Sequence, residues 1–122
     1  AGALAWHDRA RGRIDARPER AGDVILARRE TPTSYHLSVV VDDALQGVTL
    51  VTRGEDLLPA ASLHRLLQAL LGLPEPAYRH HKMLTDAEGR RLAKRDGATS
   101  LADVRASGVS AADFIAGLGF DP

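Results

Sequence analysis

Residues 48–72, VTLVTRGEDLLPAASLHRLLQALLG, decide the fold because their hydrophobic period changes from about 2 to about 3.6 residues along the stretch. The first part is rich in β-branched residues and predicts a strand that ends at Arg53. The second part predicts a helix over 56–72, with Asp56 placed to cap its start and Gly72 to end it. Five leucines fall on one face of this helix: Leu63, Leu66, Leu67, Leu70 and Leu71.

Further strands are predicted on both sides of this stretch. YHLSVVV at 35–41 has three consecutive valines and is typical of a strand buried on both faces. DVILAR at 23–28 predicts another strand, and a short strand is expected at 78–84. Residues 1–22 have no clear period and are expected to be mostly loop.

The order strand, strand, helix, strand favours an α/β fold with a parallel sheet. Ser100 and Ser110 each precede an Asp by three residues, which predicts two short capped helices in the tail. Ligands of such sheets bind at the carboxyl ends of the strands, so the polar residues that end the strands are the first candidates for a site.

Composition narrows the classes of protein. With 122 residues the chain is at most one domain, and with no cysteine it has no disulfide, thiol nucleophile or cysteine-bound zinc. No apolar run reaches the roughly 18 residues of a membrane-spanning helix and no leader sequence opens the chain, so a soluble, cytoplasmic protein without a membrane partner is expected. Because 16 basic residues balance 16 acidic ones, only a local charge excess can attract an anion.

Segment 79–95 has such an excess, with six Arg or Lys against two acidic residues. A glycine-flanked cationic loop is suited to close over polyphosphate, although the ordinary interpretation is a solvated surface loop. The adjacent histidines 80 and 81 are candidate metal ligands, but neighbours on a strand point to opposite faces and no further ligands follow at a suitable spacing. We therefore expect no metal site at this position.

Arg53 and Tyr35 have two interpretations each. The guanidinium of Arg53 can form a bidentate pair with a ligand carboxylate, or a structural pair with one of four acidic residues nearby in the sequence. Those four residues are Asp42, Asp43, Glu55 and Asp56. The phenol of Tyr35 can hydrogen-bond a ligand or belong to the core. Asp42 and Asp43 suit an acid/base pair or a magnesium site, but a helix cap is the more ordinary role.

Three motifs in this order resemble a known family. YHLSVVVDD at 35–43, RGEDL at 53–57 and RLAKR at 91–95 are similar to the second half of the catalytic domain of class I glutamyl-tRNA synthetases. Within that branch the sequence most resembles the glutamyl-Q tRNA(Asp) synthetases, shortened paralogues without an anticodon-binding domain. The resemblance implies that 1–98 form the C-terminal half of a Rossmann-like catalytic domain and 99–122 a short helical tail.

The resemblance also implies roles for single residues. Tyr35 and Arg53 would bind the substrate glutamate, and Glu55 and Asp56 would lie near the ATP ribose. Lys94 would be the catalytic lysine that neutralises ATP phosphates as pyrophosphate leaves, with Arg91 and Leu92 also at the nucleotide. The loop motif of this class, KMSKS, corresponds here to Arg91, Leu92, Ala93, Lys94 and Arg95. Its first lysine is thus replaced by Arg91 and its serine by Ala93.

The implied activity is ATP- and Mg²⁺-dependent activation of glutamate to glutamyl-adenylate, followed by transfer of the glutamyl group to queuosine of tRNA(Asp). No HIGH-type motif is present, so we expect this chain to be the C-terminal half of a catalytic domain and inactive without the N-terminal half. Zinc is expected at most in that preceding part. The alternatives are part of an ordinary glutamyl-tRNA synthetase that charges tRNA(Glu), or a non-catalytic synthetase-like binding domain.

Overall fold

The structure is a computed structural model that describes residues 3–85, 88–89 and 100–120. The chain divides into two compact units, residues 1–82 and residues 83–122. Each unit is described by itself.

The first unit is built on a four-stranded sheet in the order β2-β1-β4-β3. Its strands are β1 (Ala5–Asp8), β2 (Gly12–Asp15), β3 (Leu50–Gly54) and β4 (Ala77–His81). β4 pairs in parallel with both β1 and β3, while β2 pairs antiparallel with β1. The expected α/β fold with a parallel sheet is therefore confirmed, and an antiparallel edge strand extends it.

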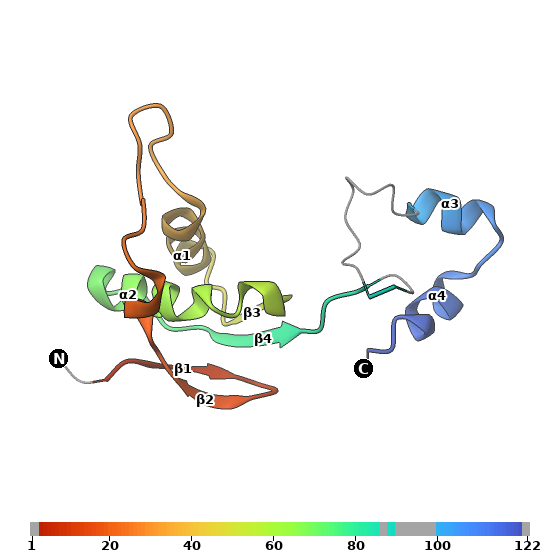
Figure 1. Cartoon of the computed structure of the whole chain (residues 1–122), viewed down its shortest axis with the longest axis horizontal. Helices are drawn as coiled ribbons and strands as arrows, with labels where there is room; N and C mark the ends of the chain where they lie inside the picture. The colour runs from red at the N-terminus through yellow and green to blue at the C-terminus, as the bar shows by residue number, and fades with distance from the viewer. Residues whose placement is uncertain (1–2, 86–87, 90–99, 121–122) are drawn as a thin grey trace. The chain divides into compact units, whose positions relative to one another are not determined.

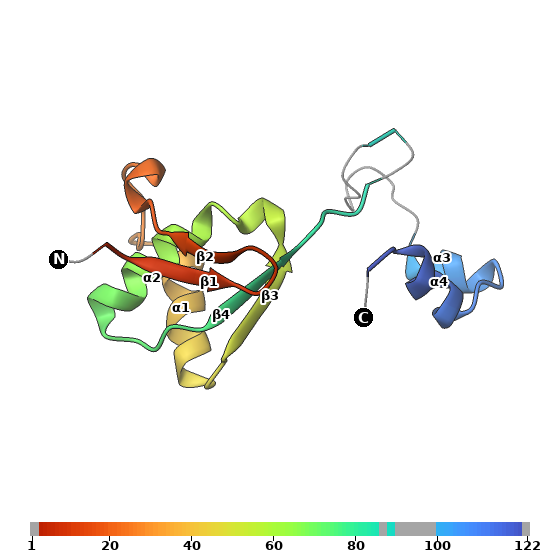
Figure 2. The same ribbon diagram turned by 90° about the horizontal axis from the view of Figure 1, so that it is seen from below.

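Helices α1 (Tyr35–Leu45) and α2 (Ala60–Leu71) lie on one face of this sheet, as Figures 1 and 2 show. Between the sheet and α2 lies a core cluster of Trp6, Ala61 and Tyr78. A second cluster joins α1 to α2 through Val40, Leu63 and Leu67. The first unit is thus layered from the sheet through α2 to α1.

The strand predicted over 35–41 is wrong, because these residues form the first two turns of α1. The hydroxyl of Ser34 caps the helix by accepting a hydrogen bond from the backbone N–H of Leu37. Val40 is buried against α2, whereas its two valine neighbours are only partly buried. Burial of one helical face therefore overrides the β propensity of three valines. Asp42 and Asp43 consequently lie within α1 and do not end a strand.

The expectation of a loop over 1–22 is also wrong, because these residues form the hairpin β1–β2 and a 3-10 turn at Pro18–Ala21. Asp8 closes the hairpin, since its carboxylate accepts hydrogen bonds from the backbone N–H groups of Ala10 and Arg11. The strand predicted over 23–28 is absent from the described structure. Those residues form one arm of a loop that projects from the body in Figure 1, joined to its other arm by backbone hydrogen bonds.

The predicted helix over 56–72 is confirmed as α2, but with a later start. Asp56 lies in a separate 3-10 turn, Glu55–Leu57, and Pro59 occupies the N-cap position. Gly72 ends the helix in the left-handed conformation, with φ of 66°, which glycine adopts at low cost. The buried face matches the leucine face only in part: Leu63 and Leu67 are buried as predicted, but His64 and Gln68 are buried too, whereas Leu70 and Leu71 are exposed.

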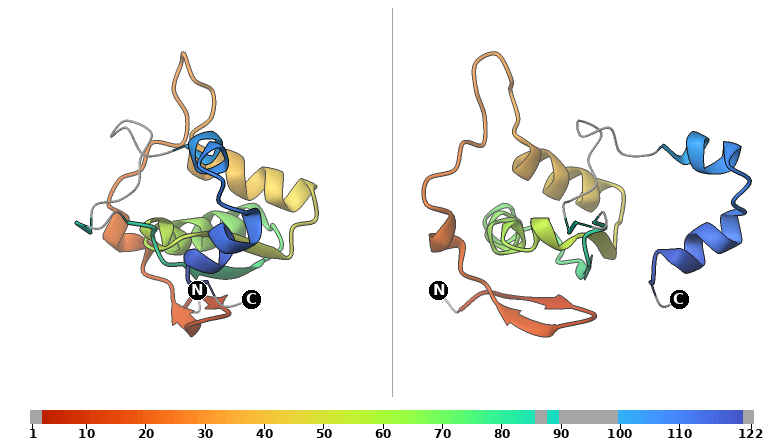
Figure 3. Two further views of the ribbon diagram at one scale, coloured as in Figure 1. Left: turned by 90° about the vertical axis from the view of Figure 1, so that its right-hand side faces the viewer. Right: turned by 45° about the vertical axis from the view of Figure 1, so that its right-hand side comes forward.

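The second unit contains α3 (Leu101–Ala106) and α4 (Ala111–Gly117), visible in Figure 3. Both helices begin as predicted, because the hydroxyls of Ser100 and Ser110 accept hydrogen bonds from the backbone N–H groups of Asp103 and Asp113. Among the described residues of the whole chain, no helix is long and apolar enough to cross a membrane.

The layered core predicts a sharp contrast between two leucines of α2. We expect Leu67→Ala, at the α1–α2 contact, to lower the free energy of unfolding by about 2–4 kcal/mol, because it leaves a cavity. Leu70→Ala, at a position 72% exposed, should change that free energy by less than about 0.5 kcal/mol. Urea denaturation of both variants measures the difference, and equal losses would contradict this description of the core.

Candidate functional site

Polar side chains converge where three parallel strands end. Asp8 is the last residue of β1, and Arg53 and His80 are each the residue before the last of their strands. Arg53 and His80 are direct neighbours in the β3–β4 register, so their side chains emerge on the same face of the sheet. This face is covered by α2, and all three side chains are buried. The carboxyl ends of parallel strands are the usual place for a ligand site in such folds.

The centre of this cluster is the guanidinium of Arg53. Its Nε–H donates to Nε2 of His80, and its Nη1 donates to Nδ1 of His64, each over 3.0 Å. Its Cζ lies 5.2 Å from the ring centroid of Tyr78, which adds a cation–π contact. Its Nη2 is buried and has no hydrogen-bond partner among the described residues. The arginine is therefore held by neutral groups and keeps unused N–H donors.

Asp8 holds His80, one of the partners of Arg53, in place. Oδ2 of Asp8 accepts from Nδ1 of His80 over 2.7 Å and from the backbone N–H of the same residue over 3.1 Å. Burial alone would raise the pKa of Asp8, but the hydrogen bonds from the His80 side chain and from three backbone N–H groups outweigh it. The pKa therefore lies below its ordinary value, and Asp8 carries a negative charge at neutral pH.

The two histidines bonded to Arg53 are neutral at neutral pH. Burial, the charge of Arg53 and the neighbouring histidines lower the pKa of His64 to about 3. Burial also lowers the pKa of His80, and the opposing hydrogen bond to Asp8 does not reverse this. A neutral imidazole has one lone pair, and here each lone pair points at an Arg53 N–H.

α1 closes the other side of the cluster. Nδ1 of His36 lies 3.0 Å from Nε2 of His64. The ring of Tyr35 packs against His36 and His64, with centroids 5.5 and 5.8 Å apart. Tyr35 is 50% exposed, so its ring joins the cluster while part of it reaches the surface. The structure thus brings the two predicted glutamate-binding residues, Tyr35 and Arg53, into contact with the same histidine, His64.

Tyr78 forms the floor beside Arg53. Its ring stacks on His80 and meets Trp6 edge-on, and its hydroxyl accepts a hydrogen bond from Nε2 of Gln68 over 3.0 Å. Burial raises the pKa of the Tyr78 hydroxyl, so it stays protonated.

The predicted structural partners of Arg53 do not bind it. Within the described residues, Arg53 forms no ion pair with the acidic residues at 42, 43, 55 or 56. Burial raises the pKa of Asp43, and the opposing charge of Arg53 does not reverse this. Glu55 instead pairs with Arg11 over 3.1 Å, and Asp56 follows it in the 3-10 turn after β3.

The loop motif lies outside the described residues. Its five members are Arg91, Leu92, Ala93, Lys94 and Arg95. His80 and His81 do point to opposite faces of β4, since the first is buried and the second exposed. Among the described residues, no three His, Asp or Glu side chains form a group able to hold a metal ion.

Six residues of the cluster were not predicted as site residues: Asp8, His36, His64, Gln68, Tyr78 and His80. Two sequence features could have indicated them: Asp8 ends a strand, and His64 and Gln68 lie on a helix that packs on the sheet. The first feature was missed because β1 was not predicted. The second was missed because the five leucines of α2 predict that a partly different face of the helix is buried.

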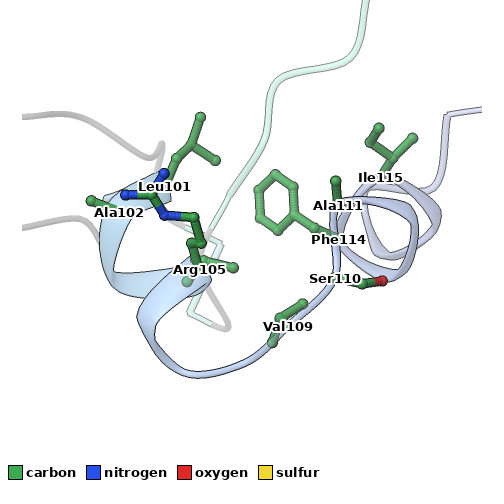
Figure 4. Close-up of a pocket in the computed structure, with 9 residues that line it drawn as sticks. Leu101, Ala102, Arg105, Val109, Ser110, Ala111, Phe114 and Ile115 are labelled. Atoms are coloured by element: carbon green, nitrogen blue, oxygen red, sulfur yellow. The ribbon is translucent and has the colours of Figure 1, made fainter.

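Each unit contains a hollow among its described residues. One of about 500 Å³ in the first unit is lined by the 3-10 turn Pro18–Ala21, the start of α2, and Trp6 and His36. The other, of about 520 Å³, lies between α3 and α4 of the second unit and is mostly apolar, with Phe114 pointing into it in Figure 4. Neither hollow is lined by Arg53.

The lowered pKa of His64 predicts acid sensitivity. The unfolded chain binds a proton on His64 below about pH 6.5, whereas the folded chain does not until about pH 3. The stability contributed by neutral His64 is therefore present above pH 6.5 and is lost as the pH falls toward 3. We expect this residue alone to account for a loss of about 2 kcal/mol in the free energy of unfolding between pH 7.5 and 5.

Urea denaturation at the two pH values measures this loss. His64→Gln should flatten the pH dependence, while His81→Gln, at an exposed histidine of β4, should leave it unchanged. An unaltered slope in His64→Gln would contradict the assignment of a neutral, buried His64.

Comparison with known proteins places the chain in a family. The family model described as tRNA synthetases class I (E and Q), catalytic domain, matches residues 1–120. A glutamyl-Q tRNA(Asp) synthetase of Rhodobacter capsulatus is 60% identical over 108 residues, which are 85% of this chain and 39% of that protein. A glutamyl-Q tRNA(Asp) synthetase of Nocardia farcinica is 47% identical over 110 residues, 90% of this chain and 33% of that protein.

Related full synthetases match as well. A glutamate–tRNA ligase of a Synechococcus species is 38% identical over 128 residues, covering 98% of this chain and 27% of that protein. The crystal structure of glutamate-tRNA synthetase from Elizabethkingia anophelis superposes with a TM-score of 0.66 at 31% identity, over 79% of this chain and 20% of that chain. This chain spans at most about two fifths of the length of these curated relatives. By the match over residues 1–120, the chain belongs to the catalytic-domain family of the class I tRNA synthetases for glutamate and glutamine.

Proposed function

We propose that the protein activates glutamate with ATP and then transfers the glutamyl group to queuosine of tRNA(Asp). The observation that carries this proposal is the guanidinium of Arg53, which is buried, bonded to two neutral histidines and left with an unpartnered Nη2. A carboxylate is the natural ligand for such a group, because paired N–H donors match its two oxygens and its charge. The similarity to two glutamyl-Q tRNA(Asp) synthetases supports the choice of reaction.

Arg53 binds the side-chain carboxylate of glutamate in this proposal. Tyr35 supplies a phenol at the same place, because its ring packs on the histidine that Arg53 bonds. The ring is half exposed, so a ligand can reach it from the surface. The charge of Arg53 and the hydroxyl of Tyr35 together suit a small acidic amino acid.

The first chemical step is formation of the adenylate. An oxygen of the α-carboxylate of glutamate attacks the α-phosphorus of ATP. The bond between this phosphorus and the oxygen that bridges it to the β-phosphate breaks, and pyrophosphate leaves. Lys94, with Arg91 and Leu92, faces the nucleotide in this proposal, and the lysine neutralises the charge that develops on the departing phosphates. Glu55 and Asp56 lie at the ribose. Mg²⁺ arrives with the nucleotide, held by its phosphates.

A second candidate is an ordinary glutamyl-tRNA synthetase that charges tRNA(Glu). It is favoured by the Synechococcus glutamate–tRNA ligase, which aligns with 98% of this chain. Both candidates share the glutamate site and the adenylate step, and they differ in the acceptor RNA.

Glutamate-dependent ATP–pyrophosphate exchange tests the first step, with the complete protein that carries this chain. We expect exchange without added tRNA, and we expect Arg53→Gln to lower kcat/KM for glutamate by about 100-fold, because a buried charge pair is worth about 2–5 kcal/mol. Arg79→Gln is the matched control, since it removes an exposed arginine from the opposite face of β4. A folded Arg53→Gln protein with undiminished kcat/KM would refute the glutamate site.

Lys94 is tested in the same exchange assay. We expect Lys94→Ala to reduce kcat by about 100-fold and to change KM for glutamate by less than about 3-fold, because the lysine acts on phosphates in the transition state. Lys82→Ala, at the other lysine of the chain, serves as the control. A change confined to KM for glutamate would contradict this role.

The acceptor decides between the two candidates. We expect radiolabelled glutamate to be attached to tRNA(Asp) that contains queuosine, and to be absent from the same tRNA with guanosine at that position and from tRNA(Glu). Labelling of tRNA(Glu) alone would replace the first candidate with the second.

A further inference from the structure

The hydrogen bonds around Arg53 run in one direction only. An arginine is always protonated and only donates, so the nitrogens facing it on His80 and His64 are both acceptors. In a neutral histidine the other ring nitrogen must then carry the proton. The geometry therefore assigns the tautomer of each histidine from a single fixed donor.

On the sheet side, the chain of hydrogen bonds that starts at Arg53 ends at the carboxylate of Asp8. Nε2 of His80 accepts from Arg53, so Nδ1–H of His80 donates to Asp8 over 2.7 Å. Asp8 is fixed in turn by the backbone N–H groups of Ala10 and Arg11. The imidazole is thereby held between a rigid carboxylate and the guanidinium, and its ring is further packed on Tyr78 and Trp6.

On the helix side, the direction ends at α1. Nδ1 of His64 accepts from Arg53, so Nε2–H of His64 donates to Nδ1 of His36 over 3.0 Å. His64 is 1% exposed and packs beside Tyr35. Two elements, α2 and β4, thus hold the guanidinium through two of its nitrogens, Nη1 and Nε.

We propose that His80 and His64 are positioning residues that hold Arg53 through neutral acceptors, so that its orientation is fixed while its charge remains available to select a carboxylate over an amide. This inference rests on the proposed function, because it presumes that Arg53 binds the glutamate side chain. An acidic partner would fix the guanidinium equally well but would neutralise it. A histidine that accepts one hydrogen bond removes rotational freedom and leaves the charge in place.

Other charged groups near Arg53 fit this assignment. Asp8 is separated from Arg53 by the ring of His80. Burial raises the pKa of Asp43 of α1 and the charge of Arg53 opposes this, but the two residues form no ion pair in the described structure. The lowered pKa values of His64 and His80 keep both rings in the accepting form at neutral pH.

The test compares two replacements of His80 in the complete protein. His80→Phe keeps an aromatic ring for stacking on Tyr78 and removes the acceptor, whereas His80→Gln restores an acceptor for Nε of Arg53. We expect His80→Phe to raise KM for glutamate about 10-fold with less than a 3-fold change in kcat, and to lower the ratio of glutamate to glutamine activation about 10-fold. His80→Gln should recover most of both effects, and His81→Phe, on the opposite face of β4, should show neither.

Several outcomes overturn the inference. One such outcome is an active wild type together with a His80→Phe variant that keeps the wild-type KM for glutamate and the wild-type glutamate/glutamine ratio. This outcome refutes the positioning role and leaves the proposed function intact. Equal losses in His80→Phe and His80→Gln indicate a structural role alone. A wild type that activates no glutamate in the presence or absence of tRNA refutes the proposed function and this inference with it.

A measurement on the wild type covers the case in which His80→Phe does not fold. Nitrogen-15 NMR of the histidine side chains at pH 7 distinguishes the two neutral tautomers. We expect His80 to carry its proton on Nδ1 and His64 to carry its proton on Nε2. The opposite tautomer, or a protonated ring, at either residue would overturn the inference.

Discussion

A buried arginine charge is the constraint on which this face of the fold depends. Arginine side chains in proteins are always charged and an unpaired buried charge is costly, so the surroundings of Arg53 must supply compensation. The compensation comes from two histidine acceptors, the face of Tyr78 and, one ring further away, the carboxylate of Asp8. The ends of β1, β3 and β4 are therefore fixed to one another by polar contacts in addition to the ladder hydrogen bonds.

The same constraint explains which face of α2 is buried. By hydrophobicity alone, Leu70 and Leu71 should face the core and His64 should face solvent, but the structure has the reverse. His64 and Gln68 lie one turn apart and reach Arg53 and Tyr78, respectively. The polar partners of the sheet thus set the rotation of the helix, and the apolar residues Ala61 and Leu67 fill the space between them.

The sequence was informative where local signals and packing agree. The strand that ends at Arg53, the glycine stop of α2 and the serine caps of α3 and α4 follow from short-range chemistry, and the structure contains each of them. The strand predicted over 35–41 is wrong because valine propensity competes with helical burial, which only the contact with α2 decides. The histidine partners of Arg53 could not be predicted from local sequence, because His64 and His80 lie 11 and 27 positions after Arg53 and only the fold brings them to it.

Selection between a carboxylate and an amide follows from which ring nitrogens remain free. The acceptor nitrogens of His64, His80 and His36 are each already engaged, two by Arg53 and one by His64. A ligand amide would bring its own N–H donors to a guanidinium that offers only donors, and those hydrogens would lose their water without gaining a partner. A carboxylate brings acceptors alone, so it suits the unused N–H donors of Arg53. The histidines therefore contribute to specificity twice, by orienting Arg53 and by leaving no acceptor of their own for the wrong ligand.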